Sequence, residues 1–129
     1  RERTSIVLCG LNADVQGLIE IENHASGAAL TDLIAAVNAR CGGAHPYALA
    51  GSNASVGTDA IRVALIYRTG VLAPVGTLQI DNDAVHNRPP NAQTFDVVDA
   101  NNPAFGERFT AIVNHFKSKD ARLHKRLGV

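Results

Sequence analysis

Methionine and tryptophan are absent from this sequence of 129 residues, and aromatic residues make up only 5% of it. So few aromatic rings argue against a stacking platform for single-stranded nucleic acid. No apolar run is long enough to span a bilayer, so we expect no membrane span. Because the first residue is Arg1 and not methionine, we expect a processed chain or an internal piece of a longer protein.

Net charge is also lacking, because 12 Lys and Arg residues balance 12 Asp and Glu residues. Without a global positive field, any contact with a polyanion must be local. A cluster of basic residues falls near the end of the chain: Lys117, Lys119, Arg122, Lys125 and Arg126. We favour a solvated helix face or a fraying end as the interpretation of this cluster over a phosphate-facing edge.

Cysteine occurs only twice, at Cys9 and Cys41, without the spacing of a metal site. Both fall on predicted helices, so they are either core thiols or one disulfide, and the usual burial of cysteine favours core thiols. The fingerprints of α/β-hydrolases, P-loop proteins and dinucleotide-binding proteins are missing. A thiol nucleophile is not expected either, because neither cysteine lies in an activating turn.

Apolar residues make up 46% of the sequence, enough for one folded domain with a core. Their spacing predicts helices over residues 4–12 and 28–41. Strands are predicted at residues 15–21, 46–50, 59–68, 71–78, 93–98 and 107–115.

Residues 59–68 form the strongest predicted strand, and their nearly continuous apolar run indicates burial on both faces. Thr69 and Gly70 suit a tight turn, so we expect residues 71–78 to return as a hairpin partner. The order of elements predicts the α/β class, with one mixed sheet and helices on one face. A second sheet, outside this sequence, is then expected to cover the other face.

Glu20 interrupts the apolar strand at residues 15–21. A buried carboxylate without a partner is costly. A hard cation such as Mg²⁺ would compensate it, since Mg²⁺ takes one or two carboxylates plus waters. A salt bridge to an arginine, or a cap on the next loop, is an equal alternative. Glu22 is interpreted as a rim residue closer to solvent.

Polar residues at the end of the last predicted strand suit a phosphate ester. His115 can donate a hydrogen bond to a phosphoryl oxygen or pass a proton, although a structural histidine is the commoner case. Asn114 and Lys117 extend this polar surface, Lys117 as a point charge. Arg88 is restricted by the prolines that follow it, which suits bidentate phosphate binding, whereas a plain surface arginine is the alternative.

Other polar residues carry weaker signals. Asp59 is expected to orient Arg62 or to cap a turn. The Asp81-Asn82-Asp83 segment lacks the rest of a calcium loop and is interpreted as a turn. The remaining histidines have no partner at helical or strand spacing, so no zinc site is predicted.

Taken in order, four segments resemble the endonuclease/exonuclease/phosphatase family, the fold of pancreatic deoxyribonuclease, and in particular its bacterial extracellular nucleases. The segments are residues 13–23 (ADVQGLIEIEN), 57–68 (GTDAIRVALIYR), 87–90 (NRPP) and 113–119 (VNHFKSK). The likeness implies that Glu20 binds the catalytic divalent cation, Mg²⁺ with Mn²⁺ or Ca²⁺ as alternatives. It further implies that Arg88 and His115 act on the scissile phosphate.

Three further residues, Asn114, Lys117 and Asp59, are candidates for substrate binding. The resemblance also implies what lies outside residues 1–129. The family's first strand would precede Arg1, and its Gly-Asp-x-Asn and Ser-Asp-His motifs would follow Val129. The chain is therefore expected to be a partial four-layer α/β sandwich that lacks the general base and has little or no activity alone.

The function implied by the resemblance is a metal-dependent phosphodiester hydrolase, a secreted nuclease acting on DNA or RNA, in the extracellular space or cell envelope. One alternative is the same fold acting on lipid or inositol phosphates. The other is a non-catalytic, degenerate half-domain that only binds. Nucleic acid is the expected substrate, and no protein partner is predicted.

Overall fold

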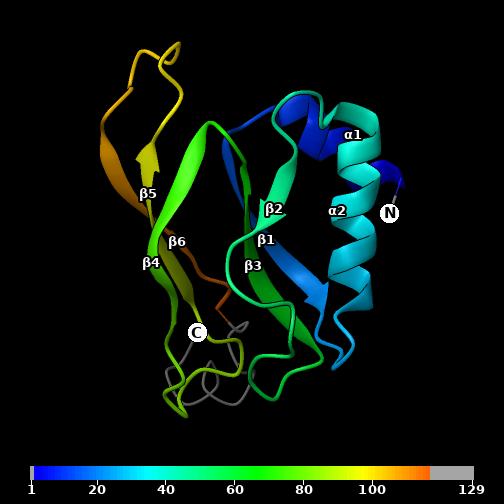
Figure 1. The fold of residues 1–129 in the computed structure, drawn as a ribbon. Helices are drawn as coiled ribbons and strands as arrows, with labels where there is room; N and C mark the ends of the chain where they lie inside the picture. The colour runs from blue at the N-terminus through cyan, green and yellow to red at the C-terminus, as the bar shows by residue number, and fades with distance from the viewer. Residues whose placement is uncertain (1, 117–129) are drawn as a thin grey trace, which may run out of the picture.

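The computed structural model describes residues 2–116 and arranges them in three layers (Figure 1). Two helices cover one face of a three-stranded sheet, and a second three-stranded sheet covers its other face. The elements are α1 (Glu2–Leu11), β1 (Val15–Glu22), α2 (Ala28–Cys41), β2 (Tyr47–Leu49), β3 (Ile61–Arg68), β4 (Leu72–Ile80), β5 (Asn91–Val97) and β6 (Arg108–Val113). The predicted mixture of helices and strands is confirmed.

The prediction of one mixed sheet is wrong. The first sheet has the strand order β1-β3-β2 and the second has the order β4-β5-β6, and every pairing is antiparallel. The covering sheet that was expected outside this sequence is thus formed by the chain itself, from residues 72–113.

The predicted hairpin between residues 59–68 and 71–78 is also wrong. Both edges of β3 are already paired, one with β1 and the other with β2. After β3 the chain turns through Gly70, which has the left-handed φ of 81° that glycine adopts without strain. It then enters the second sheet, where β4 pairs with β5.

The core lies on both faces of β3, as its apolar run indicates. On one face, Ala64 and Ile66 contact the buried side of the helices, including Leu33 and Val37. On the other face, a second cluster joins β3 to the second sheet: Val63, Leu65, Val71, Leu72, Phe95, Val97 and Val113, with Ala50. Alternate side chains of one strand therefore hold two layers together.

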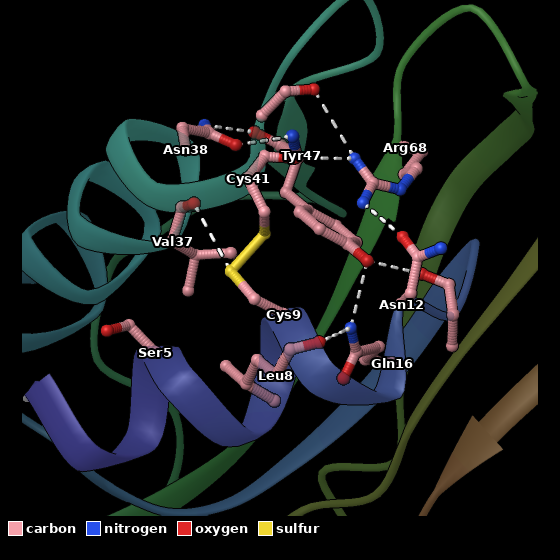
Figure 2. Close-up of a disulfide and its surroundings, with 12 residues drawn as sticks. Ser5, Leu8, Cys9, Asn12, Gln16, Val37, Asn38, Cys41, Tyr47 and Arg68 are labelled. Atoms are coloured by element: carbon pink, nitrogen blue, oxygen red, sulfur yellow. Dashed lines mark hydrogen bonds between the residues drawn. A yellow bond between two sulfur atoms is a disulfide. The ribbon is translucent and has the colours of Figure 1, made fainter.

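Cys9 and Cys41 form a disulfide that joins α1 to α2 (Figure 2). The sequence favoured two core thiols, but the helices bring the two Cα atoms to 5.8 Å, within the range of natural disulfides. The bridge closes a loop over 32 positions of the chain. Through it, the first helix is fastened covalently to the helix that covers β3.

A buried cation sits at the end of α2 (Figure 2). Arg68 donates hydrogen bonds to the carbonyl oxygen of His45 at 2.8 Å and to Asn12 Oδ1 at 2.6 Å. Its guanidinium also lies 4.4 Å from the ring centre of Tyr47, a cation–π contact. It also donates to the carbonyl oxygens of Cys41 at 3.3 Å and Gly42 at 3.4 Å, so carbonyl oxygens at the negative end of α2 take the place of a carboxylate.

None of the helices in residues 2–116 has the length and apolar content needed to cross a membrane.

Removing the disulfide should destabilise the fold. In the chain-entropy model, a loop of this length makes the bridge worth about 3–4 kcal/mol. The double variant Cys9→Ala/Cys41→Ala should therefore unfold at a clearly lower urea concentration than the oxidised wild type, measured by circular dichroism. Dithiothreitol should shift the wild-type midpoint towards that of the variant and leave the variant unchanged. Equal midpoints in all four samples would contradict this prediction.

Candidate functional site

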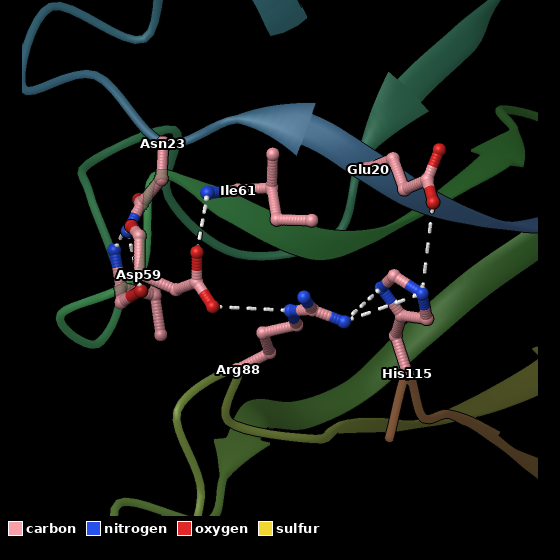
Figure 3. Close-up of polar contacts among 7 residues, drawn as sticks. Glu20, Asn23, Asp59, Ile61, Arg88 and His115 are labelled. Atoms are coloured by element: carbon pink, nitrogen blue, oxygen red, sulfur yellow. Dashed lines mark hydrogen bonds and ion pairs between the residues drawn. The ribbon is translucent and has the colours of Figure 1, made fainter. Parts of the chain in front are cut away.

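Four side chains that the sequence singled out lie in one connected row: Asp59, Arg88, His115 and Glu20 (Figure 3). Arg88 Nε lies 3.2 Å from Asp59 Oδ2, and Arg88 Nη1 lies 3.1 Å from His115 Nδ1. His115 Nε2 lies 3.8 Å from Glu20 Oε1. In that order, the four residues come from the turn before β3, the loop between β4 and β5, the segment after β6, and β1.

A close approach of β1 and β6 explains how His115 reaches Glu20. These strands belong to different sheets, yet a Cβ atom placed on Gly17 would lie 3.1 Å from Val113 Cγ2. The missing side chain at Gly17 therefore lets β6 lie directly against β1. Glu20 follows three residues after Gly17 and His115 two residues after Val113, so both emerge at the same end of the contact.

Glu20 is not the buried carboxylate that the sequence predicted, because 68% of its side chain is exposed. The register of β1 against β3 shifts between Leu18 and Ile21, and Glu20 in this bulge has a φ of 59°. A residue other than glycine rarely adopts that conformation, which costs about 1–3 kcal/mol. The bulge turns the carboxylate out of the sheet and towards His115, as Figure 3 shows. The strained backbone of Glu20 therefore places its carboxylate beside His115.

Asp59 lies in the turn before β3 and not in the strand, which begins at Ile61. Burial alone would raise the pKa of Asp59. The hydrogen bond from Arg88, two backbone amides and the charge of Arg88 outweigh burial and lower the pKa below its ordinary value. Of the two roles expected from the sequence, Asp59 caps the turn by accepting from the Ile61 amide, but it does not orient Arg62.

Arg88 is held between an acceptor on each side and is 16% exposed. A guanidinium is always protonated and only donates, so the nitrogen of His115 that it meets must be the unprotonated one. The nearer nitrogen is Nδ1, at 3.1 Å against 3.4 Å for Nε2. This assignment leaves the proton of the neutral ring on Nε2, the nitrogen that faces Glu20.

Asn23 is a positioning residue that the sequence did not reveal. Its side-chain amide donates to the carbonyl oxygens of Val56 at 2.8 Å and Asp59 at 2.9 Å, and its Oδ1 accepts from the Val56 amide. A buried arginine on β3, Arg62, holds the same loop by donating to the carbonyl oxygen of Ala54. The loop that carries Asp59 is therefore fixed from both β1 and β3.

Arg88 and His115 line a small cavity of about 120 Å³. The other residues in its wall are Val85, His86, Asn87, Pro90, Asn114 and Phe116. Asn114 is thus close to the predicted site, as the sequence suggested. Lys117 and the basic cluster that it begins lie outside the described residues.

The second histidine of this wall, His86, has the acidic partner that the sequence analysis did not find. His86 Nε2 lies 3.0 Å from Asp81 Oδ2, and both residues belong to the loop between β4 and β5. The Asp81-Asn82-Asp83 segment forms a turn, as predicted. The spacing of five residues fits neither a helix nor a strand, so only the path of the loop reveals the pair.

The row of four residues offers one available carboxylate to a metal ion. Within residues 2–116, no group of three or more His, Cys, Asp or Glu side chains could hold a metal ion. Asp59 is engaged by Arg88, so the exposed Glu20 is the available ligand of the row. One carboxylate with several waters is compatible with the way Mg²⁺ binds to proteins.

Comparison of the sequence with protein-family models, curated proteins and solved structures gives no match.

The ion pair of Asp59 and Arg88 should make stability depend on pH in the acid range. Because the folded-state pKa of Asp59 is lowered, its contribution is complete above the unfolded value of about 3.9 and is lost as the pH falls through the folded value. Asp59→Asn should therefore lower the melting temperature at neutral pH, and the gap to wild type should close in acid.

A double-mutant cycle with Arg88→Gln isolates the pair. Thermal unfolding of the four proteins, followed by circular dichroism, should give a favourable coupling at pH 7 that declines below about pH 3.9 and is lost as the pH falls through the lowered pKa of Asp59. A coupling that is zero at pH 7, or that persists unchanged in acid, would contradict this assignment.

Proposed function

We propose that this chain carries the metal-binding and phosphate-binding part of an Mg²⁺-dependent phosphodiesterase, a nuclease that hydrolyses DNA or RNA. The observation that carries the proposal is the convergence of Glu20, Arg88 and His115 from three distant segments. An exposed carboxylate stands at one end of the row, and a guanidinium and an imidazole line an adjoining cavity.

Arg88 and His115 would bind the phosphate of the substrate. The Asp59 carboxylate holds Nε of Arg88, which leaves the terminal nitrogens to donate to phosphoryl oxygens. Arg88 Nη1 now donates to His115, so an entering phosphate would compete for that hydrogen bond with a stronger, charged acceptor. Donors that are already oriented stabilise the charge that develops on the phosphate oxygens during hydrolysis without a further cost of ordering.

Glu20 would hold the cation at the edge of this site. When bound, Mg²⁺ would supply Lewis-acid polarisation of the phosphoryl group and neutralise its charge. The exposure of Glu20 supports this role, because Mg²⁺ keeps several of its waters and needs room for them. The strained bulge supports it too, since it directs an acidic group to the neighbourhood of two phosphate donors.

The architecture is compatible with the wider expectations. The structure has helices on one sheet and a second sheet behind it, and we propose that these are three layers of a four-layer α/β sandwich. We also propose that the protein acts outside the cytoplasm, in the extracellular space or cell envelope. The disulfide supports that location, because such bonds persist mainly in oxidising compartments.

Replacing Glu20 in the full-length protein tests its proposed role as a metal ligand. Glu20→Gln should reduce Mg²⁺-dependent cleavage of plasmid DNA by at least about 100-fold, because it removes the charge that holds the cation at the site. Raising the Mg²⁺ concentration should recover part of the lost activity.

Glu22→Gln is the matched control, since Glu22 lies on the same strand and is exposed. It should cleave at the wild-type rate, and both variants should keep the wild-type circular dichroism spectrum. Cleavage by Glu20→Gln at the wild-type rate and at the same Mg²⁺ concentration would remove Glu20 from the mechanism.

The 129-residue chain alone should show little or no cleavage of plasmid DNA with Mg²⁺. The resemblance assigns activation of water to a histidine and an aspartate that would follow Val129, so the chain would bind phosphate without activating water. Robust cutting by the purified chain that stops on adding a chelator would refute the incomplete-site argument.

A further inference from the structure

The pair of Asp81 and His86 has no role in the site described so far, although His86 lines the same cavity as Arg88 and His115. Its Nε2 lies 3.0 Å from Asp81 Oδ2, and three-quarters of its side chain is buried. Within the described part of the chain, no hydrogen-bond partner occupies Nδ1 of His86. One nitrogen is thus held by a carboxylate, and the other is available to a ligand.

The loop around His86 is braced by its own hydrogen bonds. The Asp83 amide donates to Asp81 Oδ1 at 3.0 Å, and the Val85 amide donates to Asp83 Oδ1 at the same distance. The backbone amide of His86 donates to the carbonyl oxygen of Asp83 at 2.9 Å. Two successive aspartate turns therefore fix the position from which the imidazole reaches the cavity.

The size of the cavity limits what it can hold. A volume of about 120 Å³ equals the share of about four waters at ~30 Å³ each. Ordinary ligand pockets begin at about 300 Å³. A single phosphate group, with its four oxygens, fits such a space, whereas a nucleoside does not.

We propose that His86, protonated and held by Asp81, is a further phosphate-binding residue of this cavity, which makes binding of a nucleic-acid backbone stronger in acid. This inference rests on the proposed function, since the phosphate that His86 contacts is the one that Arg88 and His115 bind. His86 then adds a third phosphate contact to those of Arg88 and His115.

The charges around His86 favour this assignment. Asp81 is the acidic neighbour of His86 within hydrogen-bonding distance. The hydrogen bond from the Asp83 amide lowers the pKa of Asp81, and the charge and hydrogen bond of His86 lower it further, although partial burial acts in the opposite direction. Across the cavity, Arg88 and His115 repel a protonated His86, but each has its own acidic neighbour, Asp59 and Glu20. Asp81 therefore remains a carboxylate while imidazoles change charge, and a bound phosphate would offset the remaining repulsion.

The salt dependence of binding tests the proposal, because each phosphate contact contributes a slope of about 0.9 to the plot of log Kd against log salt for duplex DNA. The measurement uses the full-length protein and a fluorescein-labelled DNA duplex, followed by anisotropy in EDTA, which prevents metal-dependent cleavage. At about pH 5.5, where imidazoles are protonated, His86→Gln should reduce this slope by about 0.9 and weaken binding several-fold. At about pH 8 the variant and wild type should agree.

His86→Lys carries a permanent charge at the same position, so at pH 8 it should show the steeper slope that wild type shows only in acid. Asp81→Asn should weaken binding at pH 5.5, because it removes the carboxylate that holds Nε2 of His86 beside the cavity. His24→Gln is the matched control, since His24 is an exposed histidine bonded to Ser26 and does not line the cavity.

Arg88→Gln separates the two proposals. If Arg88→Gln lowers the slope at both pH values while His86→Gln binds like wild type at pH 5.5, the role of His86 is overturned and the phosphate site stands. If the duplex does not bind, or if neither substitution changes the slope, both proposals fail. A lower slope for both variants at pH 5.5, with His86→Gln like wild type at pH 8, supports both.

Discussion

The constraint on which this structure depends is the central position of β3. Both faces of this strand are buried, β1 pairs along one edge and β2 pairs with residues 66–68 on the other, so it has little surface left for chemistry along its length. Polar groups that act on a ligand must then lie beyond its ends. The turn before β3 holds Asp59, and the arginine fixed by Asp59 comes from the loop between β4 and β5 of the second sheet. The candidate site therefore lies where the two sheets meet at one end of the central strand.

Complementary contacts organise the site itself. Along the row, Asp59, Arg88, His115 and Glu20 give a carboxylate, a guanidinium, an imidazole and a carboxylate, and each group has a neighbour of complementary chemistry. Such a row is stable without a ligand, since Asp59 and Arg88 form an ion pair and His115 accepts a hydrogen bond from Arg88. It can also exchange partners, because a phosphate offers Arg88 a charged oxygen in place of the imidazole nitrogen of His115. Pre-organisation and ligand exchange thus come from the same contacts.

Local sequence pattern predicted the elements well and their pairing poorly. The apolar periodicity of residues 28–41 and the continuous apolar run of residues 59–68 reflect burial of side chains, and burial is what the structure shows. Pairing depends on which strand edges remain free, and the sequence does not display edges. The run from Val71 to Leu78 was therefore assigned to β3, although β1 and β2 occupy both of its edges. The disulfide was left open for a related reason, because two cysteines on separate helices reveal nothing about how those helices face each other.

The residues of the candidate site also fall into those that the sequence reveals and those that it does not. Glu20, Arg88 and His115 were identified because each is a chemically distinctive residue at the end of an apolar segment or beside prolines. Asn23 and the pair of Asp81 and His86 were missed because their roles arise from loop paths, where residue spacing carries no periodic signal. Glu20 was identified for the wrong reason, since it was expected to be buried and is instead turned outward by a bulge.

The neutral overall charge gives these local contacts their importance. With as many acidic as basic residues, the sequence lacks a general positive field that would draw a polyanion to its surface. Affinity for a phosphate backbone must then come from the few cationic groups that meet in one place. In residues 2–116, Arg88 and the histidines beside it are such a group, because they share one cavity. Each contact added to that cavity represents a large fraction of the total, so a single imidazole that gains or loses a proton is expected to change binding measurably.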